Sequence, residues 1–331
     1  MDAEFEPPFD KRSLAWQLPV LALVVILAVT FAFKKDDSAF ASAEQPKQTD
    51  VVLNDNPHNR VIQPSFIETF ETEWNKSDWY ISDYTVSGGY FRNSWSIDNV
   101  EFPEEGGYSL KLLHARSGSM PFVGGEVQRT GWVQYGRIEG IMRPAPGSGA
   151  ASGLFTYTGN HFGDPHDEID IEWIGNRPDL VQFNVYRDGK ALGAWKHTLP
   201  FEPAAALHLY AFEWDPDEIR WYVDGELIHS VTSEEVEIPF SPQRLMTHLW
   251  TGTLYQWHGE PSFTDGTQAE VRCISYQRLD EMNSTPRCAD EYDRILRGAP
   301  HPDLVEASLN ESGDGSEAVG ADPALVPEAA E

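Results

Sequence analysis

Short runs of alternating apolar and polar residues recur along the middle of the chain, separated by clusters of Gly, Pro, Asp and Asn. Alternation with a period of two is typical of β-strands that bury one face. Clear examples are residues 108–113, 135–142, 219–223 and 227–231. The pair Asp224-Gly225, which separates the last two runs, indicates a tight hairpin turn. From Phe66 to about Arg278, the pattern therefore predicts a turn-rich all-β domain.

The two ends of the chain follow other patterns. Residues 14–33 are almost wholly apolar, which predicts a transmembrane helix of about 20 residues after a short tail, 1–13. The alternative is a signal sequence cleaved near Ala43. We favour the anchor, because four charged residues lie between the apolar run and that site. Residues 34–65 are polar and predict a linker, and residues 279–331 predict an acidic, mostly disordered tail.

One strand carries an unusual set of acidic side chains. His166 to Glu172 reads His-Asp-Glu-Ile-Asp-Ile-Glu, so Glu168, Asp170 and Glu172 alternate with two isoleucines. In a strand, alternate residues share one face, which places the isoleucines in the core and all three carboxylates opposite them. Like charges crowded on one face cost stability. The pattern therefore indicates a chemical purpose rather than a solvated acidic surface.

Carboxyl groups arranged in this way suit the hydrolysis of a glycosidic bond with retention of configuration. One carboxylate attacks the anomeric carbon, while another carboxyl protonates the leaving oxygen and later activates water. Asp170 lies between the two glutamates and is placed to hydrogen-bond the nucleophile. The spacing alone does not decide whether Glu168 or Glu172 attacks.

Residues 166–175 resemble the signature of glycoside hydrolase family 16, in the form found in bacterial lichenases (endo-1,3-1,4-β-glucanases) and plant xyloglucan endotransglucosylases. The resemblance covers roughly residues 66–278. It includes the segments 155–159, 181–186, 221–225 and 249–253. It implies a concanavalin-like β-jelly-roll sandwich of two antiparallel sheets, with the sugar bound on the concave face.

The resemblance also implies roles for single residues. The first Glu of the family signature is the nucleophile and the last is the general acid/base, which assigns these roles to Glu168 and Glu172, with Asp170 as the assisting carboxylate. The expected substrate-binding residues are Glu126, Gln128, Tyr157, His166, Asn184, Tyr186, His248 and Trp250. Trp250 is expected to be a stacking platform. For Glu126, Gln128 and His248 the alternation equally allows a structural role.

Several positions depart from the lichenase pattern. His166 stands where lichenases usually have Trp, as in the xyloglucan enzymes, and His248 replaces an Asn. The positions of the lichenase disulfide fall on Asn93 and Gly124, and the aspartate that holds structural calcium aligns with Arg272. The sugar specificity and the presence of a structural calcium ion therefore stay open, and we expect no catalytic metal and no cofactor.

Composition and net charge limit the classes of molecule that the chain is expected to bind. The chain has 331 residues and a formal net charge of −29, which argues against nucleic acid as a partner. Its two cysteines, Cys273 and Cys288, are free to pair in an extracytoplasmic setting, although the sequence leaves this open. The expected partners are a polysaccharide substrate and a membrane contacted through the N-terminal helix. We expect a monomer.

These observations predict an endo-acting, retaining β-glucan hydrolase that cleaves a 1,3-1,4-linked or related polysaccharide. A polymer substrate places the domain outside the cytoplasm, either membrane-anchored or secreted. Two rival functions stay open. The first is a transglycosylase on β-glucan or xyloglucan-type chains, and the second is a non-catalytic carbohydrate-binding jelly-roll protein.

Overall fold

The computed structural model describes residues 60–72, 75–85, 89–115, 118–282 and 284–304. The predicted apolar segment 14–33 lies outside these residues, as do the N-terminal tail, most of the linker and the end of the C-terminal tail. Within the described ranges, no helix is both long and apolar enough to cross a membrane.

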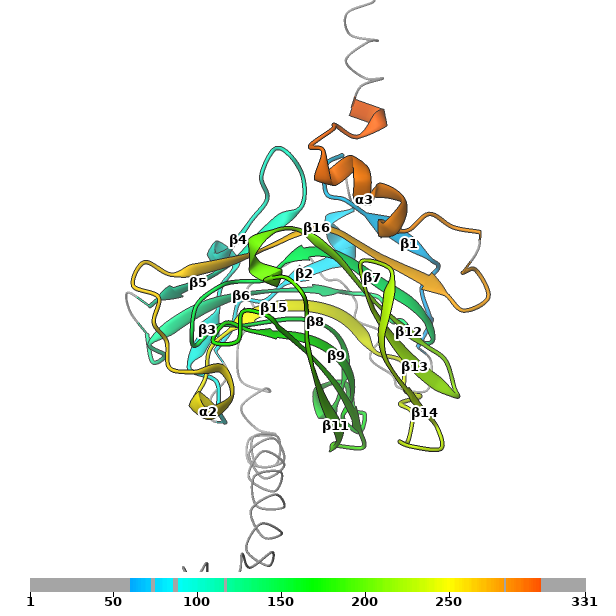
Figure 1. The fold of residues 1–331 in the computed structure, drawn as a ribbon, viewed down its shortest axis with the longest axis horizontal. Helices are drawn as coiled ribbons and strands as arrows, with labels where there is room; N and C mark the ends of the chain where they lie inside the picture. Colours follow the sequence, from blue (N-terminus) through cyan, green and yellow to red (C-terminus); the bar gives the residue numbers. More distant parts are fainter. Residues whose placement is uncertain (1–59, 73–74, 86–88, 116–117, 283, 305–331) are drawn as a thin grey trace, which may run out of the picture.

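Two sheets form the domain (Figure 1). The inner sheet contains, in order of pairing, β11 (Lys190–Thr198), β10 (Leu180–Arg187), β9 (Asp167–Ile174), β8 (Ala151–Thr158), β15 (Arg244–Trp250), β6 (Phe122–Arg129) and β2 (Trp79–Ile81). The outer sheet contains β4 (Val100–Glu101), β5 (Tyr108–His114), β16 (Thr267–Arg278), β7 (Gly136–Arg143), β12 (His208–Trp214), β13 (Glu218–Val223) and β14 (Glu226–Thr232).

Short elements complete the architecture. Strand β1 (Phe66–Glu68) pairs with β16, and β3 (Asn93–Trp95) runs parallel to β6. The helices are η1 (Lys76–Asp78), η2 (Ile97–Asn99), η3 (Asn160–Phe162), η4 (Pro203–Ala205), α2 (Tyr255–His258) and α3 (Cys288–Leu296). The two sheets are joined at one edge by a short pairing of β5 with β6. Both sheets bend together, and the inner sheet presents the concave face (Figure 1). The expected all-β jelly-roll sandwich is confirmed.

The core lies between the sheets and fixes the orientation of β9. Ile169 and Ile171 are fully buried there, as their alternation predicts. Trp221 of the outer sheet stacks on Phe183 of β10 with ring centroids 5.3 Å apart. Its indole also donates a hydrogen bond to the backbone carbonyl of Asp170 at 3.2 Å. Because the apolar face of β9 is held in this way, its acidic face must point away from the core.

Helix α3 packs against the outer sheet on the side away from the core. Ile295 of the helix joins Ile141 and Leu209 of the sheet in a small apolar cluster. The buried carboxylate of Glu139 accepts a hydrogen bond from the backbone N–H of Ala289 at 2.9 Å, at the N-terminus of the helix. An anionic group at this end of a helix is electrostatically favourable. The described part of the C-terminal tail is therefore folded onto the domain.

A disulfide between Cys273 of β16 and Cys288 of α3 holds the same helix. The sequence left this pairing open. Replacing both cysteines by serine should lower the free energy of unfolding by about 3 kcal/mol, because closing a loop of this size restricts the unfolded chain. Urea unfolding followed by tryptophan fluorescence measures the change. Wild-type protein under reducing conditions is the matched control and should lose the same amount. Equal stability of the oxidised wild type and the double variant would contradict this role.

Candidate active site

Glu168, Asp170 and Glu172 project from the concave face of β9. Strand β10 places a polar partner beside each of them. On β10, Tyr186 pairs with Glu168, Asn184 with Asp170 and Gln182 with Glu172. On β8, the residues opposite are Tyr157, Phe155 and Gly153. Because paired residues in adjacent strands share a face, the three carboxylates lie at the centre of a polar strip that crosses the sheet.

Strand β9 is fixed at its start by a buried ion pair on the other face. Asp167 is fully buried and accepts hydrogen bonds from Arg187 Nη1 and from the backbone N–H of Asp188, both at 3.0 Å. Arg187 ends β10, so the contact locks the two strands in register. Because successive residues of a strand point to opposite faces, Glu168, which follows the buried Asp167, points to the concave face.

The Glu168 carboxylate has an imidazole partner. His166 Nε2 lies 2.5 Å from Glu168 Oε2. The His166 ring stacks on Tyr186, with centroids 4.8 Å apart, and contacts Tyr157 at 5.3 Å. Burial among these groups lowers the pKa of His166 to about 4. At neutral pH the ring is therefore uncharged, and its Nε2–H can donate to an ionised Glu168.

Asp170 and Glu168 are joined by a side-chain hydrogen bond. Burial raises the pKa of both carboxyl groups, and the charge of Glu168 raises that of Asp170 further. The hydrogen bond between the two side chains raises the pKa of Asp170 and lowers that of Glu168. These opposite effects favour a proton on Asp170, which then donates the hydrogen bond to the Glu168 carboxylate.

Glu172 has a different environment, made by two amides. Gln182 Nε2 donates to Glu172 Oε2 at 3.1 Å, and Asn184 Nδ2 donates to the same oxygen. Burial raises the pKa of Glu172 well above that of a free glutamate, and repulsion from Asp170 adds to the effect, while the two amides oppose it. The raised pKa favours the protonated form, and the two amides hold the group in one orientation. These are the properties of a general acid.

The other expected binding residues lie on the same face. Glu126 and Gln128 of β6 are nearly buried, and Gln128 Nε2 donates to Glu126 Oε1 at 2.8 Å. Ser82 and Tyr84 donate to the same Glu126 oxygen at 2.5 and 3.2 Å. Much of the hydrogen-bonding capacity of Glu126 is thus used within the protein, which favours the structural role that the sequence left open.

His248 and Trp250 of β15 lie beyond Glu172. The His248 ring lies directly over Gly153, where an added Cβ would come within 2.6 Å of His248 Nε2. A side chain at position 153 would displace the ring, so the glycine makes room for it beside Glu172. Trp250 is only 4% exposed. It packs against Tyr90 and Trp257, with ring centroids 5.4 and 5.7 Å away, so its stacking surface is largely covered by protein.

Two further residues at this site, Tyr90 on a loop and Trp257 on helix α2, were not found from the sequence. The loop containing Tyr90 is joined to the segment after β15 by a hydrogen bond from Thr253 N–H to the Tyr90 carbonyl, at 2.8 Å. Burial raises the pKa of the Tyr90 hydroxyl, and the charges of Glu168 and Glu172 raise it further. The Tyr90 ring also packs against Trp250, with centroids 5.4 Å apart. Trp257 of α2 donates to Gln182. No local sequence pattern marks either residue, because both positions depend on tertiary pairing.

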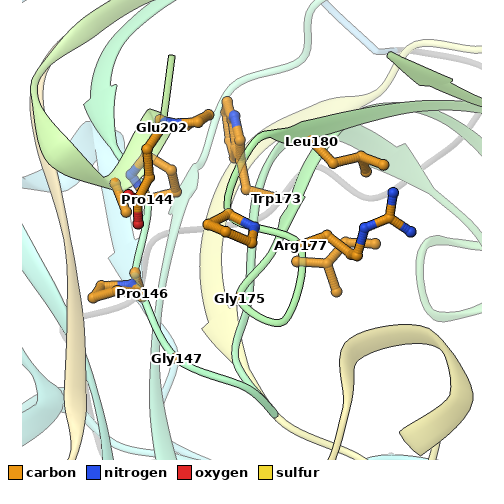
Figure 2. A pocket seen from close by; sticks show the side chains of 13 residues that line it. Pro144, Pro146, Gly147, Trp173, Gly175, Arg177, Leu180 and Glu202 are labelled. Atoms are coloured by element: carbon orange, nitrogen blue, oxygen red, sulfur yellow. The ribbon is translucent and has the colours of Figure 1, made fainter. Parts of the chain in front are cut away.

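A small pocket lies away from these carboxylates. Figure 2 shows Trp173 together with Pro144, Arg177 and Leu180 around it. Its volume is about 30 Å³, room for a water molecule but not for a sugar ring. Trp173 occupies the opposite face of β9 from Glu172, as alternation requires. This pocket therefore does not belong to the acidic site.

The structure also bears on the calcium that the lichenase resemblance brings into question. Arg272, at the aligned position, stands at a bulge of β16 between residues paired with Met142 and Ile141. Its Nη2 donates to the backbone carbonyl of Glu105 at 2.5 Å, and its Nη1 lies 3.4 Å from Glu270 Oε1. The Arg272 guanidinium already donates hydrogen bonds to these two oxygens, so they are not available to a calcium ion. Among the described residues, no group of three or more His, Cys, Asp or Glu side chains is arranged to hold a metal.

Comparisons with known proteins agree with this geometry. The family model for glycosyl hydrolases family 16 matches residues 87–271. A beta-glucanase of Paenibacillus macerans is 37% identical over 204 residues, which is 61% of this chain and 84% of that protein. The solved Bacillus licheniformis beta-glucanase is 36% identical, with a TM-score of 0.60, and the match covers 65% of this chain and 99% of that one.

A second solved structure gives the same result. A prokaryotic beta-1,3-1,4-glucanase (lichenase) derived from a mouse hindgut metagenome is 31% identical, with a TM-score of 0.62. The match covers 66% of this chain and 100% of that one. The family match spans the acidic strand and both strands that pair with it. The chain belongs to glycosyl hydrolase family 16 and is a glycoside hydrolase.

Proposed function

We propose that the protein is an endo-acting β-glucan hydrolase that retains anomeric configuration, with a 1,3-1,4-linked or related glucan as substrate. The observation that carries the proposal is the unequal environment of the two glutamates on one strand face. Glu168 contacts the neutral imidazole of His166 and shares a hydrogen bond with Asp170, whereas Glu172 accepts hydrogen bonds from two amides. The beta-glucanase relatives support the choice of substrate class.

In the proposed mechanism, Glu168 attacks the anomeric carbon while Glu172 protonates the departing glycosidic oxygen. The C–O bond to the leaving sugar breaks and a glycosyl ester forms on Glu168. Glu172, now ionised, takes a proton from water, and the hydroxide released from that water attacks the anomeric carbon and frees Glu168. His166 and Asp170 stabilise the Glu168 carboxylate as it leaves. Both displacements invert the anomeric carbon, so the net result is retention.

The remaining residues of the strip are proposed to hold the glucan. Tyr157 and Tyr186 flank the His166–Glu168 pair and are placed to contact the sugar being attacked. Asn184 and His248 lie beside Glu172 and are assigned to sugar hydroxyls. Glu126, Gln128 and Trp250 are proposed to contribute at the far end of the strip, Glu126 mainly by positioning its neighbours. No cofactor takes part in the proposed reaction.

The test is a substrate screen with product analysis. Lichenan, laminarin, xyloglucan and bacterial exopolysaccharides are incubated with the enzyme, and early products are examined by proton NMR and chromatography. We expect internal cleavage of lichenan and first products in the β configuration. First products in the α configuration would contradict the retaining mechanism. Measurable binding without release of reducing ends from any glucan would favour the carbohydrate-binding alternative.

Transfer to a sugar acceptor is the second candidate, favoured by the histidine at position 166, which matches the xyloglucan enzymes. It uses the same residues, with a sugar hydroxyl in place of water. Oligosaccharides longer than those supplied, formed at high acceptor concentration, would show transfer. Shorter products alone would show hydrolysis.

We further propose that the enzyme acts as a monomer at a membrane, outside the cytoplasm. The support is the run of about 20 apolar residues at 14–33, long enough to span a bilayer. The full-length protein is expected in the membrane fraction with its N-terminus intact, and in detergent it should have the mass of one chain. Cell fractionation, N-terminal sequencing and light scattering test these points. A soluble mature protein starting at Glu44 would show cleavage and secretion instead.

A further inference from the structure

A chain of hydrogen bonds runs from helix α2 to Glu172. Trp257 Nε1 donates to Gln182 Oε1 at 3.0 Å, although the two residues are 75 positions apart in sequence. Gln182 Nε2 in turn donates to Glu172 Oε2 and to Asn184 Oδ1, each at 3.1 Å. Asn184 Nδ2 also donates to Glu172 Oε2. Gln182 and Asn184 are both nearly buried.

The indole N–H decides which way the Gln182 amide faces. A primary amide has an acceptor end and a donor end of almost equal size, so packing alone discriminates poorly between two orientations related by a half-turn. An indole nitrogen can only donate. If the amide turned over, its NH₂ group would face the Trp257 N–H, donor against donor. Its carbonyl would then face Glu172 and compete for the proton of that carboxyl.

The orientation observed has a consequence for the proton of Glu172. Two N–H groups converge on Oε2, which occupies the lone pairs of that oxygen. When Glu172 is protonated, its proton must then reside on Oε1. Resting on the function proposed above, we propose that Trp257 is a positioning residue that fixes the Gln182 amide and so directs the proton on Glu172 Oε1 to the glycosidic oxygen.

The surroundings of Trp257 hold the indole in place for this role. Its ring stacks on Trp250, with centroids 5.7 Å apart and planes inclined by 30°. Its backbone N–H donates to the carbonyl of Leu254 at 2.8 Å, inside the turn that forms α2. Trp250 belongs to the inner sheet and is itself nearly buried. The Trp257 indole N–H is therefore held against the inner sheet, and its hydrogen bond to Gln182 is already formed in this structure.

The first test replaces Trp257 by phenylalanine, which keeps the ring and removes the donor. With lichenan, we expect kcat/KM to fall about tenfold and the basic limb of its pH profile to move up by about one unit, the size expected for loss of one hydrogen bond to a charged group. The basic limb moves up because the Gln182 amide stabilises the ionised form of Glu172. Loss of this hydrogen bond therefore raises the pKa of Glu172. With an aryl β-glucoside that has an activated leaving group, kcat/KM should change less than about twofold, because little protonation is needed.

A double-mutant cycle separates positioning from general damage. If Trp257 acts through Gln182, then Trp257→Phe should have no further effect on the pH profile in a Gln182→Ala background. Trp79→Phe is the matched control, because Trp79 is a nearly buried indole of the core whose Nε1 has no hydrogen-bond partner in the described structure. This control should leave the pH profile unchanged. Equal losses on both substrates, or equal effects in both backgrounds, would overturn the inference.

An NMR titration separates this inference from the proposed function. In protein with carbon-13-labelled glutamate side chains, the signal assigned to Glu172 by its loss in Glu172→Gln should titrate at a higher pH in Trp257→Phe than in the wild type. An unchanged titration would overturn the inference even if lichenan is cleaved. If the titration shifts but no glucan is cleaved by the wild type, the function fails and the positioning of Glu172 stands.

Discussion

Glu168→Ala should abolish the hydrolysis of lichenan, with a loss on the order of 10⁴-fold or more in kcat, and added azide should restore turnover of an activated aryl glycoside. Alanine cannot form the glycosyl ester, so the two-step route is closed. The side chain removed is half-buried between Tyr186 and Tyr157, and its loss leaves a space large enough for a small anion. Azide attacking from that space inverts the anomeric carbon once, so the rescued product is an α-glycosyl azide.

The measurement is the configuration of the azide product, read by proton NMR. Formate is a second anion that should act in the same way. Glu226→Ala, which removes an exposed glutamate of β14, is the matched control and should keep wild-type activity with no response to azide. A β-glycosyl azide from Glu168→Ala would mean that this residue is not the nucleophile.

For Glu172→Ala the expected loss depends on the leaving group. With lichenan the loss should reach about 10²- to 10⁴-fold, the usual contribution of a general acid, because the departing sugar oxygen then leaves unprotonated. An activated aryl glycoside needs little protonation, so its glycosylation step should survive. The glycosyl-enzyme then accumulates, because no base activates water. Azide needs no base and should release it as a β-glycosyl azide, after two inversions.

The pH profile provides a second measurement. Burial raises the pKa of Glu172, and activity that needs its protonated form is lost as the pH rises through that raised value. The basic limb seen with the wild type should therefore disappear in Glu172→Ala. Asp170→Asn should lower the rate without changing the stereochemistry, because it keeps the geometry and weakens the hydrogen bond to Glu168. An α-azide from Glu172→Ala, together with a β-azide from Glu168→Ala, would mean that the two roles are exchanged.

The face and the members of the acidic strip could be predicted from the sequence because they depend on local alternation. Ile169 and Ile171 require burial, and a strand allows one register for that, so the three carboxylates follow. The neighbouring strands were also identified, because segments 155–159 and 181–186 resemble strands of the family. The sequence did not reveal how side chains of these strands contact Glu172. Whether Asn184 contacts a sugar or the acid itself depends on side-chain geometry across two strands.

Tertiary contacts explain what the sequence did not reveal. Tyr90 reaches the site on a loop that is hydrogen-bonded to the chain after β15, and Trp257 reaches it from helix α2; neither lies in a periodic segment. Trp250 was expected to be an open stacking platform, but the same two residues pack against it. The disulfide was open because its formation depends on where α3 docks. That contact between Cys288 and β16 cannot be read from the spacing of two cysteines.

The position of β16 constrains the order in which the domain can be assembled during synthesis. This strand is the last of the sandwich in sequence, yet it lies between β5 and β7 and also pairs with β1. Until residues 267–278 have left the ribosome, β5 and β7 each lack a neighbour and the outer sheet has a gap at its centre. Exposed strand edges of this kind invite association with other chains. The domain therefore completes its fold only after almost its whole sequence has been made, and these two strand edges stay unpaired until then.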